Sequence, residues 1–186
     1  MDNAERIVRS LDQHLDHEVP LIVYGRAAIA LGFATAPDAV KRSLDIDAII
    51  PASRVEDFQN DLKFWDAQEA TNRELDKDGL YFTHLFEATQ VFLRRDWEQH
   101  VVPLQRPPTR WLRLFRPATL DLILTKMMRG DDAQDMADIG FLIQHDAITA
   151  AQIEMALDEA VIPDLAELRE AFEQAKPRVR DLARSG

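Results

Sequence analysis

Apolar and polar residues alternate along the first part of the chain with two different periods. In residues 3–17 the apolar side chains recur every three to four positions, which predicts a helix. Residues 21–24 and 44–50 are short apolar runs closed by glycine or proline, and such runs indicate buried strands. The alanine-rich stretch 26–31 lies between them and favours a helix. The predicted order is therefore helix, strand, helix, strand, with Gly25 as a tight turn between the first strand and the second helix.

The middle of the chain predicts one more helix and several more strands. Residues 55–65 have helical spacing. Residues 80–87 and 90–97 read as two strands of a hairpin, and residues 111–115 read as a further strand.

After Pro117 the pattern becomes helical throughout. We predict four helices, at residues 119–129, 133–144, 149 to about 160, and 163 to about 176. The fold class expected is α+β: a mixed sheet with flanking helices, followed by a helical C-terminal half. We expect an α/β core at residues 1–117 and a helical region at residues 118–186 that packs on it as a single compact unit.

Composition narrows the class of protein. The chain has 186 residues, no cysteine and a net charge of -11. Disulfides, thiolate zinc sites and cysteine nucleophiles are excluded, and a nucleic-acid binder that uses its whole surface is disfavoured. No segment reads as a signal peptide or as a membrane span. We expect a soluble, cytoplasmic protein.

One segment departs from the acidic balance. Residues 89–117 contain two acids and six arginines. The arginines are Arg94, Arg95, Arg106, Arg110, Arg113 and Arg116. Such a segment can bind a polyanion locally, which makes RNA a candidate partner. The alternative is a solvated hairpin whose arginines balance the acidic surroundings.

The chemistry of the chain is concentrated in two short stretches. Asp45 and Asp47 lie two positions apart on a predicted strand, so both side chains face the same way and can reach one divalent cation. Mg²⁺ prefers oxygen ligands and usually takes one or two carboxylates together with substrate phosphates. The turn at Gly25 leads into a helix whose first N–H groups can bind a phosphate. An exposed strand face is the alternative, but the strand is otherwise apolar, and carboxylates there are costly without a cation or partner.

These residues resemble a known family. Gly25-Arg26 followed by Ser43-Leu44-Asp45-Ile46-Asp47 is similar to the first motif of the nucleotidyltransferase superfamily, which has the polymerase-beta-like fold. Residues 120–129 and 135–139 resemble the AbiEii-like branch of minimal nucleotidyltransferases, which includes toxins of type IV toxin–antitoxin systems. The resemblance is good over about residues 20–50 and 118–143.

The resemblance implies a role for each matching residue. Asp45 and Asp47 would hold Mg²⁺, or Mn²⁺, and orient the incoming NTP. Gly25 and Ser43 would contact its phosphates, and Lys126 would offset the charge of the triphosphate. Asp135, or Asp138, would complete the site as a metal-proximal acid or general base.

Two parts of the expected site do not follow directly from the superfamily's motif: the residue after Gly25 and the third carboxylate. The superfamily usually has glycine or serine where this chain has Arg26, which could grip a phosphate or block its approach. The superfamily also uses a third carboxylate from a nearby strand, for which Glu87 is the first candidate and Asp96 the second.

His84 alternates with Phe82 and is interpreted as a core histidine.

The function implied is a Mg²⁺-dependent nucleotidyltransferase. It would move a nucleoside monophosphate from an NTP to an acceptor hydroxyl on RNA, protein or a small molecule. A toxin role would bring a cognate antitoxin as partner. The alternatives are a non-catalytic module that binds nucleotides or proteins, and a small-molecule adenylyltransferase of the antibiotic-modifying kind.

Overall fold

The computed structural model of the protein describes residues 1–185, which divide into two units. The first unit comprises residues 1–87 and 101–116, and the second comprises residues 88–100 and the chain from residue 117 onward. The chain therefore passes between the units three times. The expectation that the helical region packs on the core as a single compact unit stays a prediction.

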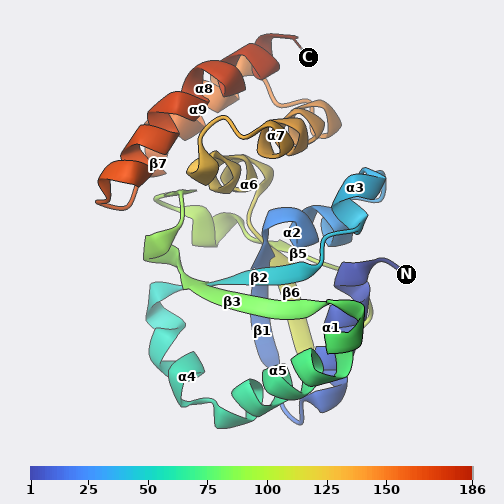
Figure 1. Ribbon diagram of the computed structural model, residues 1–186. Helices are drawn as coiled ribbons and strands as arrows, with labels where there is room; N and C mark the ends of the chain where they lie inside the picture. Colours follow the sequence, from blue (N-terminus) through green and yellow to red (C-terminus); the bar gives the residue numbers. More distant parts are fainter. Residues whose placement is uncertain (186) are drawn as a thin grey trace. The chain divides into compact units, whose positions relative to one another are not determined.

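A mixed five-stranded sheet forms the centre of the first unit (Figure 1). Its strands are β1 (Val19–Tyr24), β2 (Asp45–Ile50), β3 (Tyr81–Glu87), β5 (Val102–Pro103) and β6 (Leu112–Arg116). They stand in the order β3-β2-β1-β6-β5. β1 pairs antiparallel with β2 and parallel with β6, and β2 pairs parallel with β3. This confirms the predicted mixed sheet.

Five helices and two short turns complete the first unit. The helices are α1 (Asn3–His14), α2 (Gly25–Gly32), α3 (Asp38–Lys41), α4 (Val55–Asn60) and α5 (Leu62–Leu75). The 3₁₀ turns are Ala52–Arg54 and Asp76–Asp78. Helices α1 and α5 contact each other, while α1 also contacts β2 and α5 contacts β3.

The central strands have one buried and one half-buried face. In β1, residues 19, 21 and 23 are buried and the alternate residues are half-buried. In β2, Ile46 and Ala48 are fully buried, whereas Asp47 between them is only partly buried. Because strand side chains alternate between the two faces, Ile46 and Ala48 lie on one face of β2, and Asp45 and Asp47 lie on the other together with the buried Ile49.

The second unit is mainly helical, as predicted. Its helices are α6 (Thr119–Lys126), α7 (Ala133–His145), α8 (Ala150–Glu159) and α9 (Ala166–Ser185). It also contains the strands β4 (Leu93–Arg94) and β7 (Ala160–Val161), which pair antiparallel, and 3₁₀ turns at Ala88–Gln90, Trp97–His100 and Met127–Arg129. Thr149 caps α8 through a capping box with Gln152, which confirms the predicted start of this helix.

A buried ion pair joins β4 to α6 in the second unit. The guanidinium of Arg94 donates to both carboxylate oxygens of Asp121, at 3.2 and 2.7 Å, and the backbone N–H of Arg94 donates to the same side chain at 2.9 Å. Asp121 is completely buried. Arg94 is therefore a structural residue, and its assignment to an exposed RNA-binding segment is wrong.

The predicted hairpin of residues 80–87 and 90–97 is also wrong. Strand β3 pairs with β2, not with the segment that follows it. Within residues 90–97 only Leu93 and Arg94 form a strand, and they pair with β7. The physical reason is that Val91, Phe92 and Leu93 are all buried, so this run enters a core instead of alternating across one sheet.

Two predicted helices have different limits in the structure. The helix expected at residues 55–65 is divided at Asp61, whose carboxylate accepts from the N–H of Phe64 at 3.0 Å and begins α5. The last helix begins at Ala166 and continues past Pro177 to Ser185, where the sequence predicted 163–176. Its buried positions Phe172, Ala175 and Val179 lie on both sides of the proline, so packing overrides the usual breaking effect.

The Arg94–Asp121 pair predicts a large loss of stability when one partner is removed. Asp121→Asn leaves a buried guanidinium without its counter-charge, and we expect a cost of about 3–5 kcal/mol. Urea unfolding of the variant and the parent measures it. The double variant Arg94→Met/Asp121→Asn should recover most of the loss, because neither charge remains and an amide oxygen can still accept the backbone N–H of residue 94. A cost below about 1 kcal/mol for Asp121→Asn would show that the buried Arg94 does not depend on Asp121 for its counter-charge.

Candidate functional site

Three side chains form a row across the three strands β1, β2 and β3. Tyr24 is paired with Asp47 in the antiparallel β1–β2 ladder, and Asp47 is paired with His84 in the parallel β2–β3 ladder. Residues directly opposite each other in neighbouring strands point to the same face of a sheet. The row therefore lies on the half-buried face, with the carboxylate of Asp47 in its middle.

A β-bulge in β3 gives the row its third member. The register moves from Ile46 opposite Phe82 to Asp47 opposite His84, so Thr83 is an extra residue. Without the bulge, strict alternation would place His84 on the same face as Phe82, which is buried. The bulge turns His84 to the face of Asp47 instead, and its side chain is 68% exposed. The prediction of a core histidine is therefore wrong.

The same bulge holds the carboxylate of Asp47 in place. The hydroxyl of Thr83 donates to Oδ1 of Asp47 at 2.8 Å, and Nδ1 of His84 lies 3.7 Å from the same oxygen. The carbonyl oxygen of Ile46 lies 3.2 Å from the same hydroxyl and shares its single hydrogen with Asp47. The sequence does not single out Thr83, because a bulge leaves no signal in the pattern of one strand.

The surroundings of Asp47 disfavour the ionised form of its carboxyl group. Its burial raises the pKa of the carboxyl group, and the negative charge of Asp45 raises it further, while the Thr83 hydroxyl acts in the opposite direction. The net effect is a raised pKa. Burial, together with the charges of Asp47 and Asp45, also raises the pKa of the neighbouring Tyr24 hydroxyl. A cation bound here would relieve the desolvated negative charge.

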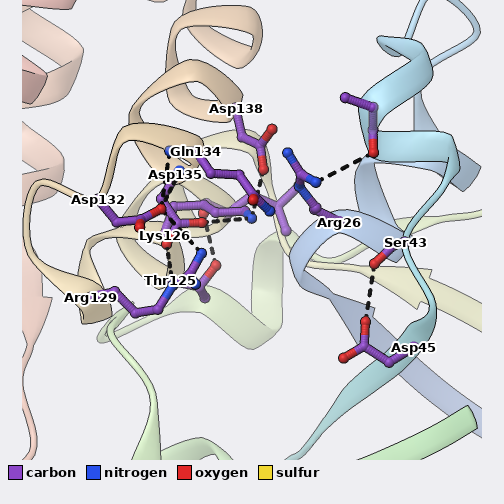
Figure 2. Close-up of polar contacts among 12 residues, drawn as sticks. Arg26, Ser43, Asp45, Thr125, Lys126, Arg129, Asp132, Gln134, Asp135 and Asp138 are labelled. Carbon is purple, nitrogen blue, oxygen red and sulfur yellow. Dashed lines mark hydrogen bonds and ion pairs between the residues drawn. The ribbon is translucent and has the colours of Figure 1, made fainter.

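Asp45 lies on the same face, two residues before Asp47. It is exposed, and its Oδ1 accepts a hydrogen bond of 3.0 Å from the hydroxyl of Ser43 (Figure 2). Both side chains therefore lie on one face of β2, and their joint binding of a cation stays a prediction. The hydroxyl of Ser43, expected to contact a phosphate, is directed at Asp45 in this structure.

Gly25 connects the row directly to a helix. It follows Tyr24, has a φ of 65° and begins α2. Open space surrounds the position where a Cβ would stand, so the positive φ, and not crowding, calls for glycine here. Tyr24, the residue before Gly25 and the partner of Asp47 in the β1–β2 ladder, makes no side-chain cap to α2 within the described residues.

Arg26 lies in the first turn of α2. Its guanidinium donates to the carbonyl of Ala39 at 3.3 Å, which links α2 to α3 (Figure 2). Arg26 is half-buried. The side chain thus makes a structural contact, and its part in phosphate binding stays a prediction.

The register does not bring Glu87 to the aspartate pair. Glu87 is opposite Ile50, three positions beyond the Asp47–His84 pair, or roughly 10 Å along the strand, and on the other face. Asp96, the second candidate, belongs to the second unit, where its Oδ2 lies 3.0 Å from Nε2 of His100. Among residues 1–185, no group of three or more histidine or acidic side chains is placed to hold a metal by itself.

The predicted residues of the C-terminal half form a cluster of their own (Figure 2). Nζ of Lys126 donates to Asp135 at 2.9 Å and to Asp138 at 2.8 Å. All three side chains are at most 8% exposed. The structure therefore brings Lys126, Asp135 and Asp138 together, as a buried ion network between α6 and α7.

Arg129, which is more exposed, adds a second cation to this network. Its Nε donates to the second oxygen of Asp135 at 2.7 Å, and it also contacts Asp132, which caps α7. Burial alone would raise the pKa of Asp135, but the hydrogen bond from Arg129 and the charge of Lys126 more than offset it. The pKa of this carboxyl is therefore lowered.

The six arginines of residues 89–117 differ in their exposure to solvent. Arg116, like Arg94, is buried, and its guanidinium stands over the ring of Phe33 at 4.5 Å. Its assignment to an exposed RNA-binding segment is likewise wrong. Four arginines remain exposed: Arg95, Arg106, Arg110 and Arg113. Of these, Arg113 forms an ion pair with Glu18 at 2.8 Å and Arg110 lies over the ring of Trp111.

The class of the protein now follows from its sheet and from the helix that starts beside the aspartate pair: the fold is nucleotidyltransferase-like. The chain belongs to the family described as nucleotidyltransferase of unknown function (DUF6036), whose model matches residues 2–180. This match supports a transferase. It does not assign the chain to the AbiEii-like branch, so that assignment stays a prediction.

No curated protein and no solved structure matches the chain. Among the described residues, no helix has the length and apolar character needed to cross a membrane.

The raised pKa of Asp47 predicts that its charge destabilises the folded protein. A folded-state pKa above the unfolded value of about 3.9 means that stability falls as the pH rises through the interval between them. Asp47→Asn should therefore be more stable than the parent at pH 7, by about 0.5–1 kcal/mol, and equal to it near pH 3. Thermal unfolding at both pH values measures this. A variant that is less stable than the parent at pH 7 would show that the fold favours the ionised carboxylate.

The buried network predicts a structural cost at Lys126. Lys126→Met leaves two buried carboxylates without their shared cation, and we expect a loss of about 3–5 kcal/mol at pH 7. The loss should shrink at low pH, because the lowered pKa of Asp135 gives stability that is present at neutral pH and disappears on acidification. Urea unfolding across pH measures it, with Lys63→Met as a control at an exposed lysine. Equal stabilities of Lys126→Met and Lys63→Met would rule out this structural role.

Proposed function

We propose that this protein is a divalent-cation-dependent nucleotidyltransferase that moves a nucleoside monophosphate from an NTP to an acceptor hydroxyl. One observation carries the proposal: the first N–H groups of α2 start at Gly25, in the residue after Tyr24, which is paired with Asp47. A site for phosphate oxygens and a carboxylate for a cation are thus neighbours. The family of the chain supports the same reaction class.

The donor set suits a hard cation such as Mg²⁺. Asp45 and Asp47 offer carboxylate oxygens on one face, and the triphosphate would supply further oxygen ligands, which is the usual way that Mg²⁺ is held. When bound, the cation would neutralise charge on the phosphates and polarise them toward displacement. The desolvated charge of Asp47 is the feature of this structure that a cation would compensate.

The residues of the first unit have distinct parts in this proposal. The N–H groups that follow Gly25 bind phosphate oxygens with the favourable end of the helix dipole. Thr83 fixes the orientation of the Asp47 carboxylate, and Ser43 does the same for Asp45. The acceptor oxygen attacks the α-phosphorus in line with the departing pyrophosphate, so positioning of the phosphate chain is the main task of the protein.

The acceptor is the open part of the proposal. RNA is one class, for which the exposed Arg95, Arg106, Arg110 and Arg113 are the candidate contacts. A protein side chain and an aminoglycoside-like small molecule are the others. A toxin role with a cognate antitoxin would be seen as growth arrest on expression that the neighbouring gene relieves.

Thermal unfolding with each of the four NTPs, with and without Mg²⁺, tests the donor side. A ligand at 100 times its Kd adds about 2.7 kcal/mol to the free energy of unfolding. We expect a Mg²⁺-dependent shift with at least one NTP, and we expect Asp45→Asn and Asp47→Asn to lose it. Asp66→Asn, which removes an exposed carboxylate from α5, should retain it. The shift is compared within each variant, because the variants differ in stability without ligand.

Transfer is then followed with an NTP labelled at the α-phosphate, offered separately with RNA, protein and aminoglycoside. Label on one acceptor class names the substrate. Binding of an NTP without transfer to any of them supports the second candidate, a nucleotide-binding module, which Arg26 favours because it stands where the superfamily usually has a small residue. Absence of any NTP-dependent shift would contradict both candidates.

A further inference from the structure

His84 occupies a position at the aspartate pair that its exposure alone does not explain. Its side chain is 68% exposed, yet Nδ1 is turned to Asp47 at 3.7 Å. The ring also leans on Phe86, with 5.4 Å between the ring centroids, and Phe86 in turn contacts Tyr24 edge-on. The imidazole is thus held on the face of the row, beside the carboxylate that the proposed function assigns to the cation.

A salt bridge is a weak reason for this arrangement. The 3.7 Å separation is longer than a hydrogen bond, and exposed ion pairs contribute little to stability. Asp47 already accepts the hydroxyl hydrogen of Thr83. The bulge interrupts the β2–β3 ladder at this one place, and bulges next to active sites serve to redirect a side chain. The redirected side chain here is His84.

We propose that His84 supplies a nitrogen ligand to the cation held by Asp47, so that the site prefers Mn²⁺ to Mg²⁺. This inference rests on the proposed function, because it concerns the same cation. An imidazole nitrogen favours divalent ions of the first transition series, whereas Mg²⁺ prefers a shell of oxygens. His84 adds an imidazole nitrogen to the carboxylate oxygens that Asp45 and Asp47 offer, and the phosphate chain and water complete the shell of the cation.

Pulsed electron paramagnetic resonance of bound Mn²⁺ tests the proposal directly. The probe is Mn²⁺ with inorganic tripolyphosphate, which contains phosphorus but no nitrogen. In the parent protein we expect electron spin echo modulation from ³¹P, which reports the phosphate chain on the metal, and from ¹⁴N, which only the protein can supply. Both signals are recorded with the full chain in solution.

Two histidine variants separate the ligand from the background. His84→Ala should keep the ³¹P modulation and lose the ¹⁴N modulation. His100→Ala removes another exposed histidine that stands beside a carboxylate, Asp96, and should keep both signals. Because the side chain of His84 is mostly exposed, its removal should leave the thermal unfolding temperature within a few degrees of the parent, which serves as the folding check.

Competition by Mg²⁺ gives a second readout. The ratio of Mn²⁺ affinity to Mg²⁺ affinity should fall at least fivefold in His84→Ala and stay unchanged in His100→Ala. Loss of the nitrogen ligand weakens Mn²⁺ more than Mg²⁺, so the direction of the change is specific to ligation. An equal loss for both ions would overturn the proposal.

The outcomes separate this inference from the proposed function. Phosphorus modulation without nitrogen modulation in the parent would overturn the role of His84 and leave the cation site of the proposed function intact. Nitrogen modulation that persists in His84→Ala would overturn it as well. No protein-bound Mn²⁺ with tripolyphosphate or with any NTP would contradict the cation site itself, and the inference with it.

Discussion

The partly buried negative charge of Asp47 is the constraint on which the site depends. Ile46 and Ala48 on either side of it are completely buried, so the strand that carries it is fixed in the sheet. Asp45 adds a second negative charge on the same face, and the neighbour of Asp47 in the row on β3 is the imidazole of His84, whose Nδ1 lies 3.7 Å from its Oδ1. A fold that keeps such a carboxylate accepts a local cost, and costs of this kind are typical of functional positions.

The arrangement of the first unit was largely predictable because its sequence signals are local. Apolar runs closed by Gly25 and Pro51 mark the strands β1 and β2, and two aspartates at an interval of two share a face by strand geometry alone. The pairing of strands was not predictable in the same way. β3 and the segment after it look like a hairpin, and only the burial of residues 91–93 in the second unit shows that they separate.

The parts of the site that the sequence did not reveal arise from register. A single inserted residue, Thr83, exchanges the faces of the residues that follow it, so His84 moves from the expected core to the row and Glu87 falls on the opposite face. Lys126 and Asp135 were found by resemblance. Their buried, fully paired network shows a structural role that residue type and spacing do not reveal.

The central claim is that Asp47 is kept in this position to bind a cation together with the phosphates of a nucleotide. Anomalous diffraction from a crystal grown with Mn²⁺ and a non-hydrolysable NTP would test it most directly. We expect an anomalous peak within about 2.0–2.6 Å of a carboxylate oxygen of Asp47, with the phosphate chain beside the start of α2. Well-ordered nucleotide with no peak at Asp47, or a peak held elsewhere in the protein, would contradict it.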